Sequence, residues 1–576
     1  MERRLLLVFA LTFLVIMLFQ PLLKKYGPQP AETKPQKQAE TAPAQSAANQ
    51  SAPGAAVSSA LTHRPATLPP SGTKQAAIEA ETTIENDLYR IRFSNHGGQV
   101  KSWILKKYDD DKGNPLELVN VAAAEKYGYP LSLWTYDESL RNKLNSALFV
   151  VSQEGMISAP AAITFEYSDS DVSVRKTFQF DHTYVVKVET SVSYKGSEIP
   201  AFSMWPSGFG DETSPASYAA GRIEYQYNSK IERLAIKKIS GGNTLPGPFN
   251  WAGVVNQYFA AVFIPDEPQN AAMVTLRNSL DVPKDAKNPN PNDTVKVELL
   301  GAAVGNTKGR SVGQMFVGPK SLPIVESVHV PTITGAEQDL RGLVNFGFFG
   351  IIARPLFLWL KWTYDHMVPN WGWAIVIQTL IINLALLPLR ISQMKSMLKM
   401  QRVAPQIKSI QEKYKKYGMR DPRKQQMNVD ISALYKKEGV NPAGGCLPLI
   451  IQMPFLFAYY SMLGAVLDLR HAHWIWIRDL SSPDPWHILP IAVIITMLFM
   501  QRMTPQAGMD PAQQKMMNLM MPVMLGVISW NLAAGLCLYW AEGNLIGIVQ
   551  QAIMNRTELG REMREMMEKR ARKKDK

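Results

Sequence analysis

The run EGVNPAGGCLPLIIQMPFLFAYYSML, Glu438 to Leu463, sets the architecture that we expect for this 576-residue chain. Asn441 and Pro442 stop one helix, because a proline cannot continue helical hydrogen bonding. Residues 443–467, which follow, contain no Lys, Arg, Asp or Glu. About twenty apolar residues cross a hydrocarbon core of about 30 Å. The run therefore predicts a membrane helix, and Gln452 places an amide inside it.

Similar apolar segments lie on both sides of this helix. Residues 370–389 carry no charge, residues 486–503 carry only Arg502, and residues 516–555 carry only Glu542. The last segment is long enough for two spans, 516–532 and 534–554. We therefore expect a core of five spans within residues 370–555.

The N-terminus adds one more span. In residues 1–26, about nineteen apolar-dominated positions lie between basic pairs with no A-x-A-like cleavage site, which predicts an uncleaved signal anchor. Residues 27–77 are rich in Pro, Ala, Gln, Ser and Thr and predict a disordered linker, with a span of about 40 Å as a flexible coil. The predicted fold class is thus a multi-domain membrane protein with six transmembrane α-helices.

Residues 78–335 follow a period of two, as in DVSVRKTFQFDHTYVVKVETSVSY, Asp171 to Tyr194. Alternation between turn residues over this length predicts a large all-β sandwich. His96 and His182 raise the alternative of a sugar-processing site. Scattered histidines in a β domain are more often surface or packing residues, so we expect no catalysis there.

Two further helical segments flank the first core span. Residues 336–369 are apolar but broken by charges and a proline, which favours an amphipathic helix in the membrane interface. Residues 390–439 predict a cytoplasmic helical hairpin whose helices end at Gly418 and Gly439. The hairpin could be a solvated loop near anionic lipid or a docking surface for a ribosome or nascent chain, and both interpretations stay open.

Charge gives the orientation. Between Arg390 and Lys437 there are thirteen Lys or Arg against three acids, which predicts a cytoplasmic loop. The tail, 556–576, has nine basic and five acidic residues. Counting spans from the loop makes this tail and the N-terminus cytoplasmic and the β domain external. The net charge of +13 is then mainly a topology signal, and we expect no specific nucleic-acid partner.

Composition narrows the chemistry. The only cysteines, Cys446 and Cys537, lie in apolar runs, and the chain has no nucleotide-binding glycine loop and no H-E-x-x-H motif. We expect no catalytic residues, no cofactor and no metal, and therefore no enzyme.

The run from Glu438 to Leu463 closely resembles the YidC family of membrane protein insertases. MFVGPK, Met315 to Lys320, and DPAQQKMMNLMMPV, Asp510 to Val523, carry the same resemblance. It covers nearly the whole chain and points to the Gram-negative form, which has a large periplasmic domain and lies in the bacterial inner membrane.

The resemblance implies a hydrophilic groove among the five core helices, open to cytoplasm and lipid. A client, meaning the membrane protein being inserted, would pass its polar tail through this groove without ATP hydrolysis. Implied partners are nascent membrane proteins, a Sec-type translocon, anionic lipids and a ribosome at the hairpin and tail. Thr379 matches a groove threonine of the family, and Tyr539 and Trp540 match an aromatic pair.

Other polar residues in the predicted spans would face the same groove, because polar groups in membrane helices normally face a bundle interior or water. The full set of candidate groove residues is Gln378, Thr379, Asn383, Arg390, Gln452, Tyr539, Trp540, Glu542 and Asn544. Glu542 could instead lie at a helix contact, where Gly543 and Gly547 allow close approach.

One position departs from the family. Five residues before Pro388 the family usually has an arginine, and this chain has Asn383. Arg390 lies two helical turns further on nearly the same face and could supply the positive charge. Alternatively, Glu542 could make the groove neutral or acidic. We favour Arg390.

Two rival functions remain to be weighed. A secondary transporter would predict inverted repeats and matched broken helices, and no such repeat is evident. An anchored periplasmic carbohydrate-binding protein would place the activity in the β domain.

Overall fold

A computed structural model gives the structure of residues 72–227, 230–285, 290, 292–332, 338–414, 416–417, 421–440, 447–503, 516–558, 560–562 and 565. The predicted signal anchor and most of the predicted linker and tail lie outside these residues, as do Asn441 and Pro442.

In the described residues from 72 to 339 the main elements are strands, in three main sheets and one small one. The first sheet has the order β4-β3-β2-β1-β7, with β1 (Glu81–Glu85), β2 (Tyr89–Ser94), β3 (Gln99–Asp109), β4 (Pro115–Glu117) and β7 (Gly155–Ser158).

The second sheet is the largest, with the order β14-β13-β16-β17-β20-β10-β9-β8-β6 and β11 beside β10. Its strands are β6 (Val150–Val151), β8 (Ala161–Ser168), β9 (Val172–Phe180), β10 (Val185–Tyr194), β11 (Ser197–Glu198), β13 (Arg222–Tyr227), β14 (Lys230–Leu234), β16 (Trp251–Val255), β17 (Phe259–Pro265) and β20 (Ser311–Pro319).

The third sheet has the order β15-β18-β19-β12-β5, with β5 (Leu133–Trp134), β12 (Phe202–Trp205), β15 (Asn243–Pro246), β18 (Ala271–Pro283) and β19 (Thr294–Asn306). A small sheet pairs β21 (His329–Val330) with β22 (Gln338–Asp339). The four short helices of this β domain are α2 (Val121–Tyr127), α3 (Glu138–Ser146), α4 (Pro215–Ala219) and α5 (Leu322–Glu326).

The predicted alternation is visible in β9, where alternate residues from Val172 to Phe180 face the core. Lys176 belongs to this inward row and is fully buried. Its Nζ donates hydrogen bonds to the carbonyls of Gly97, Gly98 and Leu131 at 3.1, 2.6 and 2.5 Å. The β-rich domain thus contains a buried lysine that the alternating pattern alone does not explain.

The described residues after 339 form mainly helices: α6 (Gly350–His366), α7 (Trp371–Ala385), α8 (Leu387–Lys413), α9 (Pro422–Lys437), α10 (Leu447–Ala465), α11 (Ile488–Met503), α13 (Met521–Ser529) and α14 (Ala534–Arg556). A π-helical turn, Met516–Met520, precedes α13.

The helix expected over residues 336–369 is shorter than predicted. Its first part pairs as β22 and forms a 3₁₀ turn, and α6 begins only at Gly350. The physical reason lies at Gly347, which has a φ of 68° and whose amide donates a hydrogen bond to the Asn345 side-chain oxygen. A left-handed glycine with a side-chain turn favours a loop over a helix.

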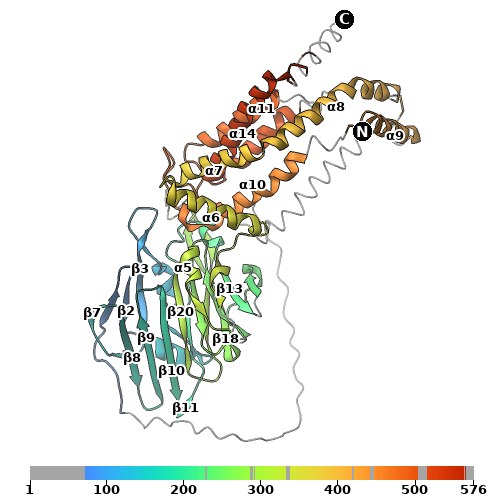
Figure 1. The fold of residues 1–576 in the computed structure, drawn as a ribbon. Helices are drawn as coiled ribbons and strands as arrows, with labels where there is room; N and C mark the ends of the chain where they lie inside the picture. Colours follow the sequence, from blue (N-terminus) through green and yellow to red (C-terminus); the bar gives the residue numbers. More distant parts are fainter. Residues whose placement is uncertain are drawn as a thin grey trace.

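Figure 1 shows the β domain at one end of the helical region, with the α8–α9 hairpin and the C-terminal end of α14 toward the other end. One hydrophobic core runs without interruption from the β domain through Leu340 and Phe346 into α6, α7, α10 and α14. The two parts of the molecule are therefore packed against each other.

Large apolar side chains cover the outside of α7, α11, α13 and α14, for example Ile381, Ile495, Val527 and Val549. Among the described residues, no single helix is long and apolar enough to count as a membrane span by length and composition. The helices α6 and α7 satisfy these criteria as a pair bent by 120°. The predicted count of six spans is not confirmed.

Candidate functional site

A cluster of polar side chains lies inside the helical region, and three of its members come from α7. Gln378, Thr379 and Asn383 are all buried. Thr379 donates its hydroxyl to the Ile375 carbonyl at 2.7 Å, and Asn383 donates its amide to the Thr379 carbonyl at 2.8 Å. These bonds within the helix satisfy the donors, and they leave the Asn383 carbonyl oxygen, Oδ1, to accept from elsewhere.

Arg390 of α8 donates a hydrogen bond to this acceptor. Its Nη2 donates to Asn383 Oδ1 at 3.0 Å, so the half-buried guanidinium reaches back along the chain to α7. Helix α14 passes close by at Gly547, where an added Cβ would lie 2.6 Å from Arg390 Nη1. The positive charge is thus held beside the position where the family usually has its arginine.

Helices α10 and α14 close the cluster. Tyr459 of α10 is fully buried and donates its hydroxyl to the side-chain oxygen of Gln378. Its ring stacks on Tyr539 of α14 with centroids 4.1 Å apart. Gln550, also on α14, donates to the main-chain carbonyl of Asn383 at 3.2 Å. Four helices therefore meet at one polar centre.

Glu542 brings a carboxylate to the same centre. It is half-buried and interacts with Thr379 and Tyr459. Its Oε2 is enclosed and has no hydrogen-bond partner among the described residues. No Lys, Arg or His among the described residues forms an ion pair with Glu542. We call the set the polar cluster: Gln378, Thr379, Asn383, Arg390, Tyr459, Tyr539, Glu542 and Gln550.

Three predicted groove residues lie elsewhere. Asn544 donates its amide to Thr496 of α11 at 3.2 Å, which places it on a different face of α14. Trp540 is half-buried beside Tyr539, and Gln452 is half-buried two helical turns before Tyr459 on α10. The structure therefore brings six of the nine predicted residues into the polar cluster.

Tyr459 and Gln550 were not among the predicted groove residues. Tyr459 lies in the apolar run FAYYSML, where a tyrosine is an ordinary packing residue. The Tyr459 hydroxyl is identified as part of the cluster only by its hydrogen bond to Gln378, which lies on another helix. Gln550 lies eleven residues after Tyr539, about 20° away around the helix, and this spacing is a signal that could have found it.

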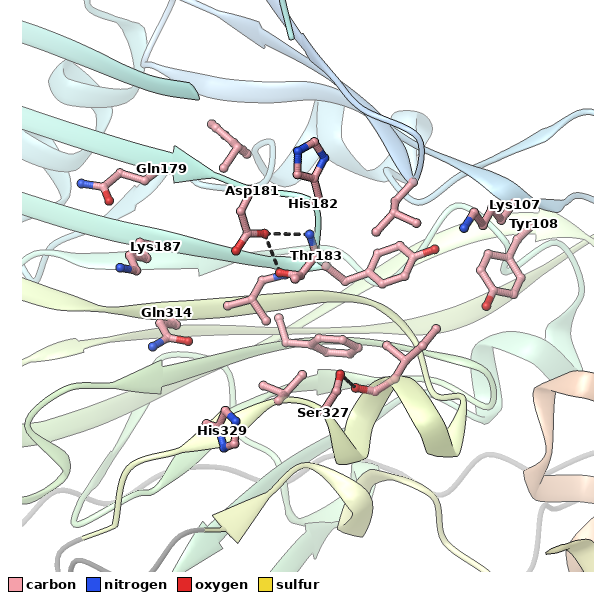
Figure 2. Close-up of a pocket in the computed structure, with 17 residues that line it drawn as sticks. Lys107, Tyr108, Gln179, Asp181, His182, Thr183, Lys187, Gln314, Ser327 and His329 are labelled. Carbon is pink, nitrogen blue, oxygen red and sulfur yellow. Dashed lines mark hydrogen bonds between the residues drawn. The ribbon is translucent and has the colours of Figure 1, made fainter. Parts of the chain in front are cut away.

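The β domain has a cavity of its own, of about 610 Å³, and Figure 2 shows its lining. His182 lines it, whereas His96 does not and instead bridges to Leu148. Asp181 is the only carboxylate among the 17 residues that line the cavity, and its Oδ1 already accepts two hydrogen bonds from Thr183. Glycoside hydrolysis generally needs a pair of carboxylates, so these residues do not favour it.

No group of three or more His, Cys, Asp or Glu side chains among the described residues could hold a metal ion. The polar cluster likewise offers no such set of ligands. What it can do chemically is provide hydrogen-bond partners, one guanidinium and one carboxyl group inside an otherwise apolar helical region.

The chain matches two family models. Residues 81–359 match the model described as the YidC periplasmic domain, and residues 362–561 match the model described as the 60Kd inner membrane protein. Together the models cover both the β domain and the helical region.

Named relatives match over most of their length. Membrane protein insertase YidC of Syntrophus aciditrophicus is 30% identical over 586 residues, covering 96% of this chain and 100% of the relative. The protein of the same name from Geobacter metallireducens is 30% identical, covering 92% of this chain and 96% of the relative.

A crystal structure titled as an active YidC insertase, with its first transmembrane domain resolved, matches with 19% identity and a TM-score of 0.34. That match covers 84% of this chain and 95% of the other chain. The sequence relatives confirm the resemblance that the motifs predict. The chain belongs to the YidC family of membrane protein insertases.

Proposed function

We propose that the protein inserts integral membrane proteins into the bacterial inner membrane and helps them to fold there. The polar cluster is the observation that carries the proposal. Arg390 and Glu542 lie in an apolar helical region, and neither forms an ion pair with a described residue. Buried charges of this kind are costly in a membrane and mark paths for polar or charged groups.

In the proposed mechanism, the polar cluster lines a hydrophilic groove that receives the client's polar tail. The client's apolar segment enters lipid beside the apolar outer faces of the helices. Burial of about twenty apolar residues is favourable in itself, so the main barrier is the loss of water around the polar tail. The hydrogen-bonding groups of the cluster lower that barrier, and no nucleotide has to be hydrolysed.

The sign of the charge then sets the preference among tails. Arg390 replaces the family arginine in function, because Asn383 holds its guanidinium at 3.0 Å. An acidic tail gains a charge-assisted hydrogen bond to this group, and such bonds contribute about 1.5–3 kcal/mol. We therefore assign Arg390 the role of attracting acidic client tails.

We further propose six membrane spans: the anchor, 1–26, and five core spans at 370–389, 443–467, 486–503, 516–532 and 534–554. The excess of basic residues in the α8–α9 hairpin supports a cytoplasmic location for it. The β domain lies at the opposite end of the helical region in Figure 1, which supports a periplasmic location. Both chain termini are then cytoplasmic.

Nascent membrane proteins are the proposed clients. A Sec-type translocon, a ribosome and anionic lipids are proposed as further partners. The hairpin supports the last two, because it exposes cations such as Lys408, whose side chain is 75% exposed. Cations of this kind attract ribosomal RNA and anionic lipid alike.

The test is insertion by the purified full chain alone. Proteoliposomes containing it receive a single-span client with an acidic N-terminal tail, without nucleotide or translocon, and insertion is read as protection of the tail from added protease. We expect protected tails with the protein and background levels in empty liposomes. Equal protection in both would contradict the proposal.

A further inference from the structure

The β domain meets the helical region at Arg470, in the segment 466–487 between α10 and α11. This side chain is only 10% exposed. Its Nη1 lies 3.9 Å from Asp211 Oδ2, and its Nη2 lies 3.7 Å from Asp111 Oδ1. His471 adds a second contact to Asp111, with Nε2 at 3.2 Å. One arginine of the helical region is therefore held between two carboxylates of the β domain.

Aromatic rings and two hydrogen bonds surround this arginine. The Arg470 guanidinium carbon lies 5.3 Å from the ring centroid of Tyr258 and 5.6 Å from that of Phe259. Tyr258 donates its hydroxyl to Ser481 Oγ at 3.1 Å. Gln257 donates its amide to the carbonyl of Gly464 at 3.1 Å. The contact thus engages both the loop and the last turn of α10.

Asp211, one of the two carboxylates, is held in place by hydrogen bonds within the β domain. Asn256 donates to Asp211 at 2.6 Å, and its side-chain oxygen accepts from the amides of Tyr258 and Phe259 at 2.9 and 2.8 Å. Lys320 donates to the Asn256 carbonyl at 2.6 Å. Burial raises the pKa of Asp211 to about 6, while Arg470 acts in the opposite direction. Arg470 therefore contacts a carboxylate that the β domain's own hydrogen bonds hold in place.

We propose that Arg470 locks the β domain to the outer end of α10, so that the two move as one body. Removal of one partner from a buried ion pair leaves the other charge buried without compensation, which is strongly destabilising. Without the Arg470 guanidinium, the Asp211 carboxylate would be hydrated only if the interface opened. The observations that support the lock are separate from those that support the insertion mechanism, because none of the residues that form the lock belongs to the polar cluster.

The lock has a consequence for the helices. Gly464 lies five residues after Tyr459 on α10, and Tyr459 is the member of the polar cluster that joins α10 to α7. A displacement of α10 at the cluster therefore reaches the β domain through Gln257 and Arg470. The β domain would then move together with this helix.

Hydrogen–deuterium exchange of the full chain in lipid nanodiscs tests the lock, with Arg470→Gln as the main variant. We expect exchange at residues 256–259 of the β domain and at residues 466–481 to rise together, by about tenfold or more. Arg470→Lys keeps the charge and should retain part of the protection. Arg310→Gln is the matched control, because its ion pair with Glu189 is exposed and lies away from the interface.

Faster exchange at residues 466–481 with full protection at 256–259 would overturn the proposal, because Arg470 would then stabilise only its own loop. If Arg470→Gln does not fold, Gln257→Ala provides the milder test. It removes one hydrogen bond across the same interface and should accelerate exchange at Gly464 and at residues 466–481. Unchanged exchange there would also overturn the lock.

Discussion

Gly547 of α14 offers a way to displace the Arg390 guanidinium without removing its charge. A methyl group at this position would lie 2.6 Å from Arg390 Nη1 and 2.6 Å from Met500 Cε. Gly543, one turn earlier, is the matched control. There the nearest atom would be Asn383 Nδ2 at 3.8 Å, an ordinary contact. Both substitutions to alanine raise helix propensity by about 1 kcal/mol, so only the steric effect differs.

The expected magnitude follows from the geometry. Non-bonded heavy atoms prefer about 3.5–4.0 Å, so the guanidinium must shift by about 1 Å in Gly547→Ala. Its hydrogen bond to Asn383, now 3.0 Å, would then be too long. Loss of a charged hydrogen bond costs about 1.5–3 kcal/mol, which corresponds to about tenfold or more in the correctly placed population.

The assay is insertion of an acidic-tailed, single-span client into proteoliposomes, measured by protease protection. We expect Gly547→Ala to lower the insertion rate by about tenfold and Gly543→Ala to match the unsubstituted protein. Equal rates for all three proteins would refute the claim that the position of the Arg390 charge matters. If both variants insert the client equally slowly, the loss of rate comes from altered helix packing and not from the position of the Arg390 charge.

Three further predictions concern stability. Lys176→Met leaves three buried carbonyls without their donor, so the unfolding free energy of the β domain should fall by about 3 kcal/mol or more in urea titrations followed by tryptophan fluorescence; an unchanged midpoint would contradict this. The folded-state pKa of Asp211, about 6, lies above the ordinary 3.8, so the neutral form is favoured on folding. The stability of the β domain should therefore decrease by about 3 kcal/mol as pH rises from about 4 to 6, and Asp211→Asn should reduce this dependence, while the neighbouring Glu212, whose pKa is also raised by burial, retains a dependence of the same sign. Tyr459→Phe leaves the Gln378 side-chain oxygen without its donor and should lower thermal stability by about 1–3 kcal/mol while keeping the ring stack; an unchanged melting temperature would show that this bond contributes nothing.

Local patterns in the sequence predicted what depends on local chemistry. Alternation along β9 and β10 predicted strands because a half-buried sheet imposes a period of two. The same alternation places Lys176 inward, but its three carbonyl partners come from distant turns that no local pattern reveals. The late start of α6 depends on the turn at Asn345 and Gly347, which the apolar pattern of residues 336–369 did not predict.

In the candidate site, too, local sequence patterns predicted some residues and missed those whose role depends on another helix. Polar residues on α7 could be identified because they interrupt an apolar run, and the spacing of Arg390 from Asn383 predicted that the two lie on nearly the same helix face. Asn544 bonds to α11 instead of joining the polar cluster, because the rotation of α14 is set by packing against two neighbours. The role of Tyr459 depends on Gln378 of another helix, so the sequence of α10 alone could not indicate it.

The most direct test of the account compares insertion of acidic-tailed and basic-tailed clients by four proteins: unsubstituted, Arg390→Ala, Arg390→Ala with Asn383→Arg, and Glu542→Gln. We predict that Arg390→Ala loses insertion of the acidic tail and that Asn383→Arg restores it, because the charge returns to the same place in the cluster. Glu542→Gln should leave acidic tails unaffected. The account is contradicted if Arg390→Ala inserts acidic tails normally while Glu542→Gln changes which tail charge is accepted.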